Sequence, residues 1–246
     1  MKQTILTVTK NIPIAKDCFR MELTGDISAI TAPGQFVNFQ LEGRYLRRPI
    51  SVCDVEGDTL TILYKVVGGG TADLSRMQAG ANIDTLVGLG NGFDVTLSGN
   101  APLLIGGGIG VPPLYLLCRK LCAASVKPTV VLGFRSADDV VLAEEFSALG
   151  VEVFVATEAG SCGKKGYVTD IMKDLTYTYF YTCGPMPMFR AIEKVATSDG
   201  EYSFEERMGC GFGACMGCSC KTLTGYKRIC VDGPVMKRGE ILWEQA

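Results

Sequence analysis

The first 98 residues alternate apolar and polar positions with a period of two, as β-strands with one buried face do. Phe19, Met21 and Leu23 show this alternation. Five or six short strands separated by turn residues are predicted, within residues 4–14, 18–25, 34–43, 47–58 and 59–67. Because no long helical period interrupts them, they predict a small antiparallel barrel, with a β-sandwich as the alternative.

From Pro102 onward, short apolar runs alternate with segments of helical period. The expected strands are residues 103–107, 128–134, 151–157 and 179–185, and the expected helices are residues 112–124, 142–150, 169–175 and 187–199. This alternation is typical of a parallel sheet with helices on both faces. The predicted fold is therefore β followed by α/β, with a barrel in residues 1–98, a nucleotide-binding α/β domain in residues 99–200 and a small tail in residues 201–246.

Composition narrows the possible partners. With 246 residues and 47% hydrophobic content, the chain can fill two modest cores or one large one. The formal net charge is -2, and no long run of one sign offers a surface for nucleic acid or an anionic membrane. The most apolar stretch, residues 103–118, is interrupted by four glycines and two prolines, which argues against a membrane span. No signal peptide is recognisable at the start, so we expect a cytoplasmic protein whose partners are small molecules and proteins.

The chain contains no histidine and eleven cysteines. The lack of histidine removes every Ser-His or Cys-His triad and the commonest general base. Chemistry must then come from cofactors, thiols or carboxylates. Five of the cysteines lie in the tail.

Four tail cysteines have the spacing of metal-cluster ligands. Cys210, Cys215 and Cys218 form the pattern C-x4-C-x2-C, and Cys230 follows after eleven intervening residues. This is the plant-type order of ligands for a 2Fe-2S cluster. Glycines between the ligands allow amide N–H groups to point at the sulfurs. The sequence thus predicts a loop shaped around an iron-sulfur centre.

Other uses of these cysteines stay open. Four thiolates also make a closed zinc site, although zinc sites usually contain two short paired knuckles rather than a four-residue gap. Disulfides require an oxidising compartment. Cys220 lies two residues after Cys218 and could replace it as a ligand; we favour Cys218, with Cys220 as a buried bystander.

Two segments of the first domain suggest a flavin or phosphate ligand. Residues 48–51 read Arg-Pro-Ile-Ser at the start of a strand, where a guanidinium suits a phosphate and a serine hydroxyl suits the edge of a flat ring. In residues 65–77 a strand runs into a glycine turn and a short helix, with Thr71 as the expected N-cap. Free amides at that helix start would cradle an anion, the alternative being a flexible surface turn.

The second domain has two candidate turns. Residues 106–113 read Gly-Gly-Gly-Ile-Gly-Val-Pro-Pro, where glycine lets a pyrophosphate approach the backbone and proline suits the first helical position. Pro113 stands where the G-x-G-x-x-G fingerprint requires its third glycine. Cys183 follows another strand and is expected at the carboxyl edge of the sheet, where ligands of open α/β folds bind; a buried structural cysteine is the alternative.

These elements together resemble the ferredoxin-NADP reductase superfamily: a barrel with R-x-x-S and a glycine turn, then an α/β domain with GGGIGVPP and TCGPMPM. Proteins of that superfamily bind FAD on the barrel and a nicotinamide nucleotide on the α/β domain. The tail ERMGCGFGACMGC, followed by ICVDGPV, makes the whole chain similar to the electron-transfer subunits of class 1B dihydroorotate dehydrogenases.

The resemblance implies a role for each motif. Residues matching the FAD-binding segments are Arg48, Pro49, Ile50, Ser51, Lys65, Val66, Val67, Gly70 and Thr71. Residues expected to support NAD phosphates are Gly106, Gly107, Gly108 and Gly110. The cluster ligands are Cys210, Cys215, Cys218 and Cys230, the last after a shorter gap than the family leads us to expect. Cys183 would lie near flavin and nicotinamide and tune hydride transfer by contact rather than as a nucleophile.

The resemblance also implies a function. A flavin exchanges two electrons as hydride or one at a time, whereas an iron-sulfur cluster carries one. In this family a separate FMN-containing subunit oxidises dihydroorotate for pyrimidine biosynthesis, and electrons pass through the cluster and FAD to NAD+, in a heterotetramer of two chains of each kind. Arg135, after the second strand, could favour a 2'-phosphate, yet the family indicates NAD. The alternatives are a reductase subunit of a sulfhydrogenase or transhydrogenase, or a zinc-binding, redox-sensing regulatory module.

Overall fold

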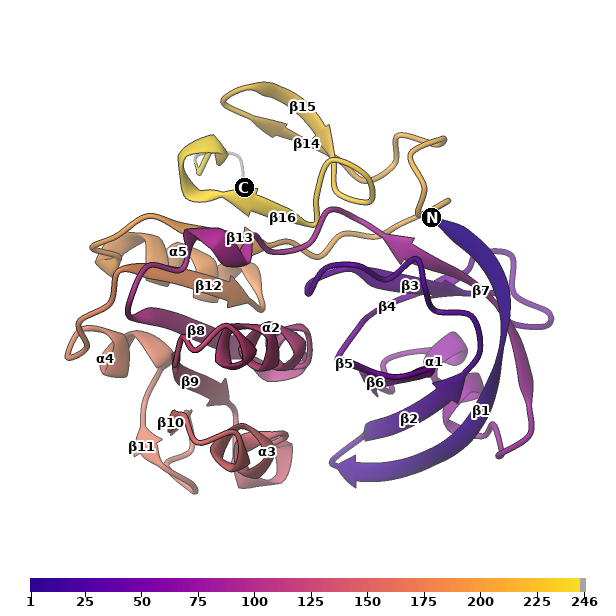
Figure 1. Cartoon of the computed structure of the whole chain (residues 1–246), viewed down its shortest axis with the longest axis horizontal. Coiled ribbons are helices and arrows are strands. Elements are labelled where there is room, and N and C mark those ends of the chain that lie inside the picture. The colour runs from indigo at the N-terminus through magenta and orange to yellow at the C-terminus, as the bar shows by residue number, and fades with distance from the viewer. Residues whose placement is uncertain (244–246) are drawn as a thin grey trace.

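The chain forms two seven-stranded sheets with a small cysteine-rich tail lying across both, as the computed structural model of residues 1–243 shows (Figure 1). The first sheet has the order β4-β3-β7-β1-β2-β6-β5, and every neighbouring pair is antiparallel. Its strands are β1 (Lys2–Ala15), β2 (Cys18–Thr24), β3 (Phe36–Phe39), β4 (Arg48–Ser51), β5 (Asp54–Glu56), β6 (Thr59–Lys65) and β7 (Asn82–Leu89). The sheet curls into a half-open barrel, and the short helix α1 (Gly69–Ser75) follows β6.

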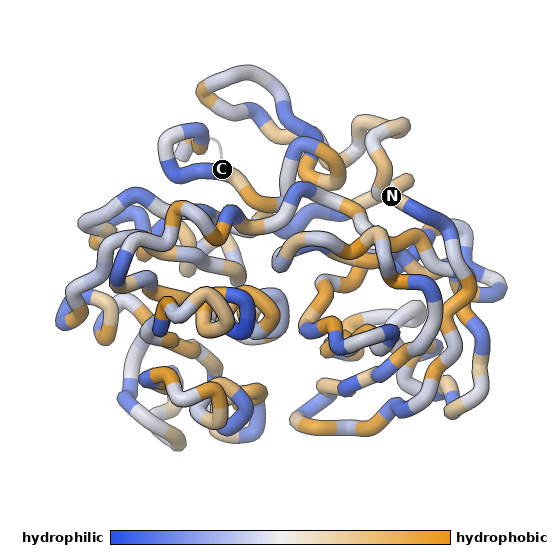
Figure 2. The backbone as a smooth tube through the Cα atoms, in the orientation of Figure 1, coloured by the Kyte–Doolittle hydropathy of each residue, from blue (hydrophilic) through white to orange (hydrophobic). Residues whose placement is uncertain are grey.

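The period-two pattern has the expected physical basis in β2. Met21 and Leu23 are fully buried in the barrel core with Leu6 and Val8, while the residues between them are only partly buried. The tube in Figure 2 shows the same alternation of apolar and polar segments around the barrel.

Strand β7 was missed by the sequence interpretation because both of its faces are buried. Ile83 and Val87 point into the barrel core, whereas Leu86 and Leu89 pack in a second core together with the tail. A strand covered on both sides loses the alternation that marks a half-exposed one.

The second sheet has the order β11-β10-β9-β8-β12-β13-β16 and is parallel except where β16 joins its edge. Its strands are β8 (Pro102–Gly107), β9 (Thr129–Phe134), β10 (Glu152–Thr157), β11 (Lys164–Lys165), β12 (Tyr179–Cys183), β13 (Gly200–Ser203) and β16 (Val235–Lys237). Its helices are α2 (Pro113–Ala123), α3 (Ala143–Ala148), α4 (Val168–Met172) and α5 (Met186–Val195), with 3-10 turns at Val95–Leu97, Gly108–Gly110, Ala137–Asp139 and Arg238–Glu240. Residues of α2 and α3 enter one core and residues of α4 and α5 the other, so helices cover both faces as predicted.

The tail is tied into the second sheet. The expected boundary between residues 200 and 201 falls inside β13, and β16 pairs antiparallel with β13. Adding β16 covers the edge that β13 would otherwise expose.

The tail forms a hairpin of β14 (Ser219–Thr222) and β15 (Gly225–Arg228), in which Thr222 pairs with Gly225 across the turn. The Thr222 hydroxyl sets the turn: it donates to the Gly225 carbonyl at 2.7 Å and accepts from the Thr224 amide at 3.3 Å. Such short-range hydroxyl bonds compete with continued strand pairing.

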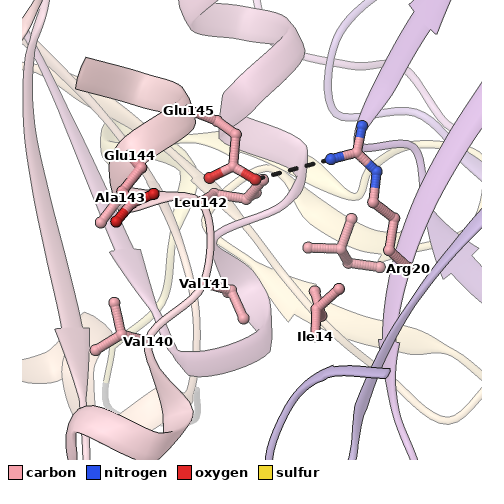
Figure 3. A pocket seen from close by; sticks show the side chains of 9 residues that line it. Ile14, Arg20, Val140, Val141, Leu142, Ala143, Glu144 and Glu145 are labelled. Carbon is pink, nitrogen blue, oxygen red and sulfur yellow. Dashed lines mark ion pairs between the residues drawn. The ribbon is translucent and has the colours of Figure 1, made fainter. Parts of the chain in front are cut away.

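The barrel and the second sheet share an interface rich in ion pairs. Arg119 of α2 donates to both carboxylate oxygens of Asp54 at 2.7 and 2.6 Å, and Arg20 of β2 faces Glu145 of α3 at 3.7 Å (Figure 3). Two pockets lie along this interface, and neither is lined by a residue of the predicted cofactor motifs. Among residues 1–243, no helix combines the length and apolar character needed to cross a membrane.

Candidate functional site

The predicted flavin segments come together where β4 meets the start of α1. An added Cβ at Gly70 would lie 2.0 Å from Arg48 Nε, so the guanidinium rests directly on the first turn of the helix. The Arg48 guanidinium donates through Nη1 to the carbonyls of Leu46 and Arg47, at 2.5 and 3.3 Å. A guanidinium beside helix-start amides suits a phosphate.

Thr71 is not the N-cap, which corrects the sequence prediction. The N-cap is Gly68, and Thr71 occupies the third helical position. Its hydroxyl accepts from the amides of Val67 and Gly68 at 2.9 and 3.2 Å. Glycine can adopt the backbone conformation at the start of the helix without a capping side chain. The Thr71 hydroxyl can therefore bind the free amides from inside the first turn.

The remaining flavin candidates divide into two groups. Val67 is 81% exposed beside the glycine turn, an apolar surface that a flat ring would cover. Lys65 instead directs its ammonium to Asp139 of the second domain at 3.1 Å. The residues at this site therefore fit FAD with Arg48 and the α1 turn at its phosphates, whereas the Lys65 side chain links the two domains.

The glycine turn after β8 is shaped mostly by packing. An added Cβ at Gly110 would lie 2.6 Å from the Cys183 carbonyl oxygen, and one at Gly107 would lie 2.5 Å from Met188 Sδ. Gly108 differs: its φ is +54°, and an added Cβ would meet no atom within 4 Å. Only Gly108 therefore presents backbone to open space, where a dinucleotide phosphate can approach.

Cys183 ends β12, between Gly106 of β8 and Ser203 of β13. It is at the carboxyl edge of the sheet, as the sequence predicts. The side chain is 1% exposed, and burial raises the pKa of its thiol above the ordinary value. A neutral, buried thiol fits a contact role better than nucleophilic attack, since the thiolate is the reactive form.

The cysteine loop directs backbone amides at sulfur. Cys210 Sγ accepts from the amides of Ala214, Cys215 and Phe212 at 3.2, 3.4 and 3.5 Å. Burial raises the pKa of the Cys210 thiol, but these amide bonds outweigh it and bring the pKa down to about 6. Amides that stabilise a thiolate suit a cluster ligand, which must be deprotonated.

Two of the other predicted ligands also accept hydrogen bonds from backbone amides. Cys215 Sγ accepts from the amides of Cys210 and Gly217, each at 3.4 Å, and Cys218 Sγ accepts from the Cys230 amide at 3.4 Å. Cys218 and Cys230 are buried, while Cys220 is half-buried on β14. Within residues 1–243, no three His, Cys, Asp or Glu side chains gather as a site for a single metal ion. A 2Fe-2S cluster shares four thiolates between two irons, so the fit here rests on the amides directed at sulfur.

Glu201 is a buried carboxyl that sequence reasoning missed. It lies in β13 between Tyr181 and Lys237, is 3% exposed and accepts from the Asp94 amide at 3.0 Å. Burial and the charges of Asp94 and Glu240 raise the pKa of the Glu201 carboxyl, whereas the hydrogen bond from the Asp94 amide and the charge of Lys237 lower it. The net result is a pKa of about 7 instead of 4.5. Through this hydrogen bond Glu201 connects Asp94, in the segment between the two sheets, to strand β13, where the tail strand β16 pairs.

We expect Glu201 to make the protein less stable as pH rises from about 4.5 to about 7, because the unfolded chain loses this proton before the folded one does. The contribution is on the order of 2–3 kcal/mol. Glu201→Gln should therefore match the wild type at pH 4.5 and exceed its free energy of unfolding by about 2 kcal/mol at pH 8 in urea titrations.

Glu152→Gln, an exposed change on β10, is the matched control and should stay within about 0.5 kcal/mol of the wild type at both pH values. Equal stabilities of Glu201→Gln and wild type at pH 8 would contradict the buried-charge account.

The comparisons with known proteins agree with this geometry. The fold is that of ferredoxin reductase-like flavoproteins: a solved NADH-dependent reduced ferredoxin-NADP oxidoreductase, described in a study of flavin-based electron bifurcation, matches with a TM-score of 0.88 and 29% identity over 98% of this chain and 91% of that chain. Residues 205–242 match the model of the iron-sulfur cluster binding domain of dihydroorotate dehydrogenase B, and residues 104–194 match the oxidoreductase NAD-binding domain.

Two curated relatives cover nearly the whole chain. Both are dihydroorotate dehydrogenase B (NAD(+)) electron transfer subunits, one from Geobacillus sp. (strain WCH70), 43% identical over 98% of this chain and 99% of its own length, and one from Fusobacterium nucleatum, 41% identical over the same shares. The chain belongs to the family of dihydroorotate dehydrogenase B (NAD(+)) electron transfer subunits.

Proposed function

We propose that this chain is the electron-transfer subunit that connects oxidation of dihydroorotate on a partner chain to reduction of NAD+. It would hold FAD at Arg48–Ser51 and the α1 turn, NAD at the turn after β8, and a 2Fe-2S cluster at the four tail cysteines. When bound, the flavin exchanges electrons singly or as hydride, and the cluster carries them one at a time. The names and domains of the relatives support this assignment.

The observation that carries the proposal is the position of the cysteine loop. Cys218 and Cys230 share a core with Leu86 and Leu89, on the outer face of the barrel strand β7. Strand β7 neighbours β3, which pairs with the flavin strand β4. The predicted cluster and flavin sites therefore lie on neighbouring strands of one sheet.

The partner is proposed to dock over the cysteine loop. Phe212, Met216 and Val231 are 46%, 54% and 41% exposed around the predicted ligands, and Cys215 is exposed among them. Apolar side chains exposed together mark interaction surfaces. The proposed occupant is an FMN-containing dihydroorotate-oxidising subunit, because an electron donor must approach the cluster closely. The complex is proposed to contain two copies of each chain.

The test is co-expression with an FMN-containing dihydroorotate dehydrogenase chain. We expect a stable, coloured complex that oxidises dihydroorotate with NAD+ at a higher kcat/KM than with NADP+. Arg135 is exposed after β9 and would have to bind the 2'-phosphate if NADP+ were preferred. A colourless, zinc-loaded protein, or a complex without dihydroorotate-NAD+ activity, would refute the proposal.

A second candidate is a reductase subunit of a transhydrogenase-type complex. The whole-chain similarity to the NADH-dependent reduced ferredoxin-NADP oxidoreductase favours it. Formation of a complex with a subunit of a ferredoxin-NADP oxidoreductase, instead of with the dihydroorotate-oxidising chain, would identify this second function.

A further inference from the structure

Asn38 lies between the flavin strand and the cysteine loop. It is in β3, opposite Pro49 of β4 and Leu86 of β7. Directly paired residues of an antiparallel sheet share one face, so Asn38 and Pro49 project from the same side of the barrel. Asn38 is 1% exposed, which is unusual for an amide side chain.

The amide of Asn38 contacts the cysteine loop directly. Its Nδ2 donates to the carbonyl oxygen of Cys210 at 3.2 Å, across 172 positions of sequence. The next residue, Gly211, has a φ of +79°, and an added Cβ there would lie 2.4 Å from Asn38 Nδ2. The cysteine loop therefore packs against the Asn38 side chain, which positions the first predicted cluster ligand, Cys210.

The other half of the same amide has no partner. Asn38 Oδ1 is one of two buried side-chain N or O atoms in the described part of the chain without a hydrogen bond. Leaving a buried acceptor unpaired costs about 1–3 kcal/mol. Turning the amide over would not help, since Oδ1 would then face the Cys210 carbonyl, another acceptor. Asn38 Oδ1 can therefore accept a hydrogen bond from a bound ligand.

We propose that Asn38 is a positioning residue of the electron path, which fixes the Cys210 loop through Nδ2 and accepts a hydrogen bond from bound FAD through Oδ1. FAD fits this role because its ring N–H and ribityl hydroxyls are donors, and because the predicted flavin strand lies next to Asn38 in the sheet. One side chain would thus hold both redox groups in fixed relation. The inference rests on the proposed function, since it requires both cofactors.

Two substitutions separate the two halves of the amide. Asn38→Asp keeps an acceptor but places a carboxylate against the Cys210 carbonyl, whereas Asn38→Leu removes both bonds at similar volume. The matched control is Gln40→Leu, because the side-chain amide of Gln40 donates within its own loop, to the Leu41 and Arg44 carbonyls at 3.4 and 3.1 Å. Each variant is studied in the holoprotein.

Three quantities are measured: FAD affinity by fluorescence on release, flavin reduction by NADH in stopped flow, and the subsequent rate of cluster reduction by rapid-freeze EPR. Asn38→Leu should bind FAD about tenfold more weakly, as loss of one net hydrogen bond predicts. Asn38→Asp should retain FAD. Both should slow cluster reduction by about tenfold or more, since small displacements of reacting groups have effects of this size. The NADH-to-flavin step should stay within about twofold, because Asn38 does not touch the nucleotide turn.

Several results would overturn the inference. An unchanged cluster-reduction rate in Asn38→Asp removes the role at the loop, even if Asn38→Leu fails to fold. Wild-type FAD affinity in Asn38→Leu would exclude the hydrogen bond to the flavin. Equal losses of FAD affinity and of the cluster-reduction rate in Gln40→Leu would show that the effects come from lower barrel stability. A wild-type protein that lacks the cluster or flavin, or whose cluster NADH does not reduce, refutes the proposed function itself.

Discussion

Cys215→Ser should abolish the 2Fe-2S absorption and EPR signals and lower electron transfer from the dihydroorotate-oxidising partner by about two orders of magnitude or more. Loss of residues that merely support metal ligands already costs about 10–100-fold, and Cys215 is a predicted ligand itself. NADH oxidation with a two-electron dye should remain near the wild-type rate, because the proposed flavin and nucleotide sites lie on other elements.

The structure favours a local effect of this substitution. Cys215 is exposed, and its sulfur accepts hydrogen bonds from amides of its own loop, those of Cys210 and Gly217. Replacing sulfur by oxygen at an exposed position opens no cavity. Loss of all flavin in this variant would contradict the separation of the cluster from the flavin site.

Cys220→Ser is the matched control. Cys220 is half-buried on the hairpin strand β14, whereas Cys218 is buried and accepts the Cys230 amide. Cys220→Ser should therefore retain the cluster signals and full partner activity. If Cys220→Ser loses the cluster while Cys218→Ser keeps it, the third ligand has been assigned to the wrong residue.

The sequence predicts those parts of the fold that depend on local pattern. Strands such as β2, with one buried face, display their period in the sequence, and the helices of the second domain begin and end near the expected residues. The cysteine spacing likewise lies within one short segment. A pattern of this kind is sufficient because its physical cause, burial of one face or geometry of one loop, is also local.

The remainder depends on contacts between distant segments. Strand β7 lacks a clear period because the tail covers its outer face, and Glu201 resembles any polar residue of a strand until the interdomain linker buries it. Asn38 stands in the apolar run Phe-Val-Asn-Phe, the single signal that a polar group is needed there, yet its contact lies at Cys210. Pairing across such separations is not encoded in a window of neighbouring residues.

Gly110→Ala is expected to destabilise the protein by about 3 kcal/mol and to lower NADH turnover with it, whereas Gly108→Ala should affect mainly nucleotide binding. At Gly110 the new Cβ would meet three backbone atoms, the Cys183 carbonyl oxygen at 2.6 Å, the Cys183 carbonyl carbon at 2.7 Å and Gly184 Cα at 2.7 Å. Backbone cannot rotate away as a side chain can, so the turn must move from the end of β12. That displacement would also shift Cys183.

At Gly108 the added methyl meets no protein atom within 4 Å but requires an alanine at a φ of +54°, a cost of about 1–2 kcal/mol. The methyl would occupy the space that a dinucleotide phosphate needs. We expect the KM for NADH to rise by about tenfold or more with kcat little changed, since the lost contact is made equally in the ground and transition states.

Gly239→Ala provides the matched control, because Gly239 has an ordinary φ and open space around its Cβ position. It should leave the melting temperature and the KM for NADH at wild-type values. Thermal denaturation and steady-state NADH-dye kinetics on the three variants distinguish packing from ligand contact. A Gly108→Ala protein with unchanged KM would show that the nucleotide phosphates lie elsewhere, and a fully stable Gly110→Ala protein would show that the turn is not held against β12.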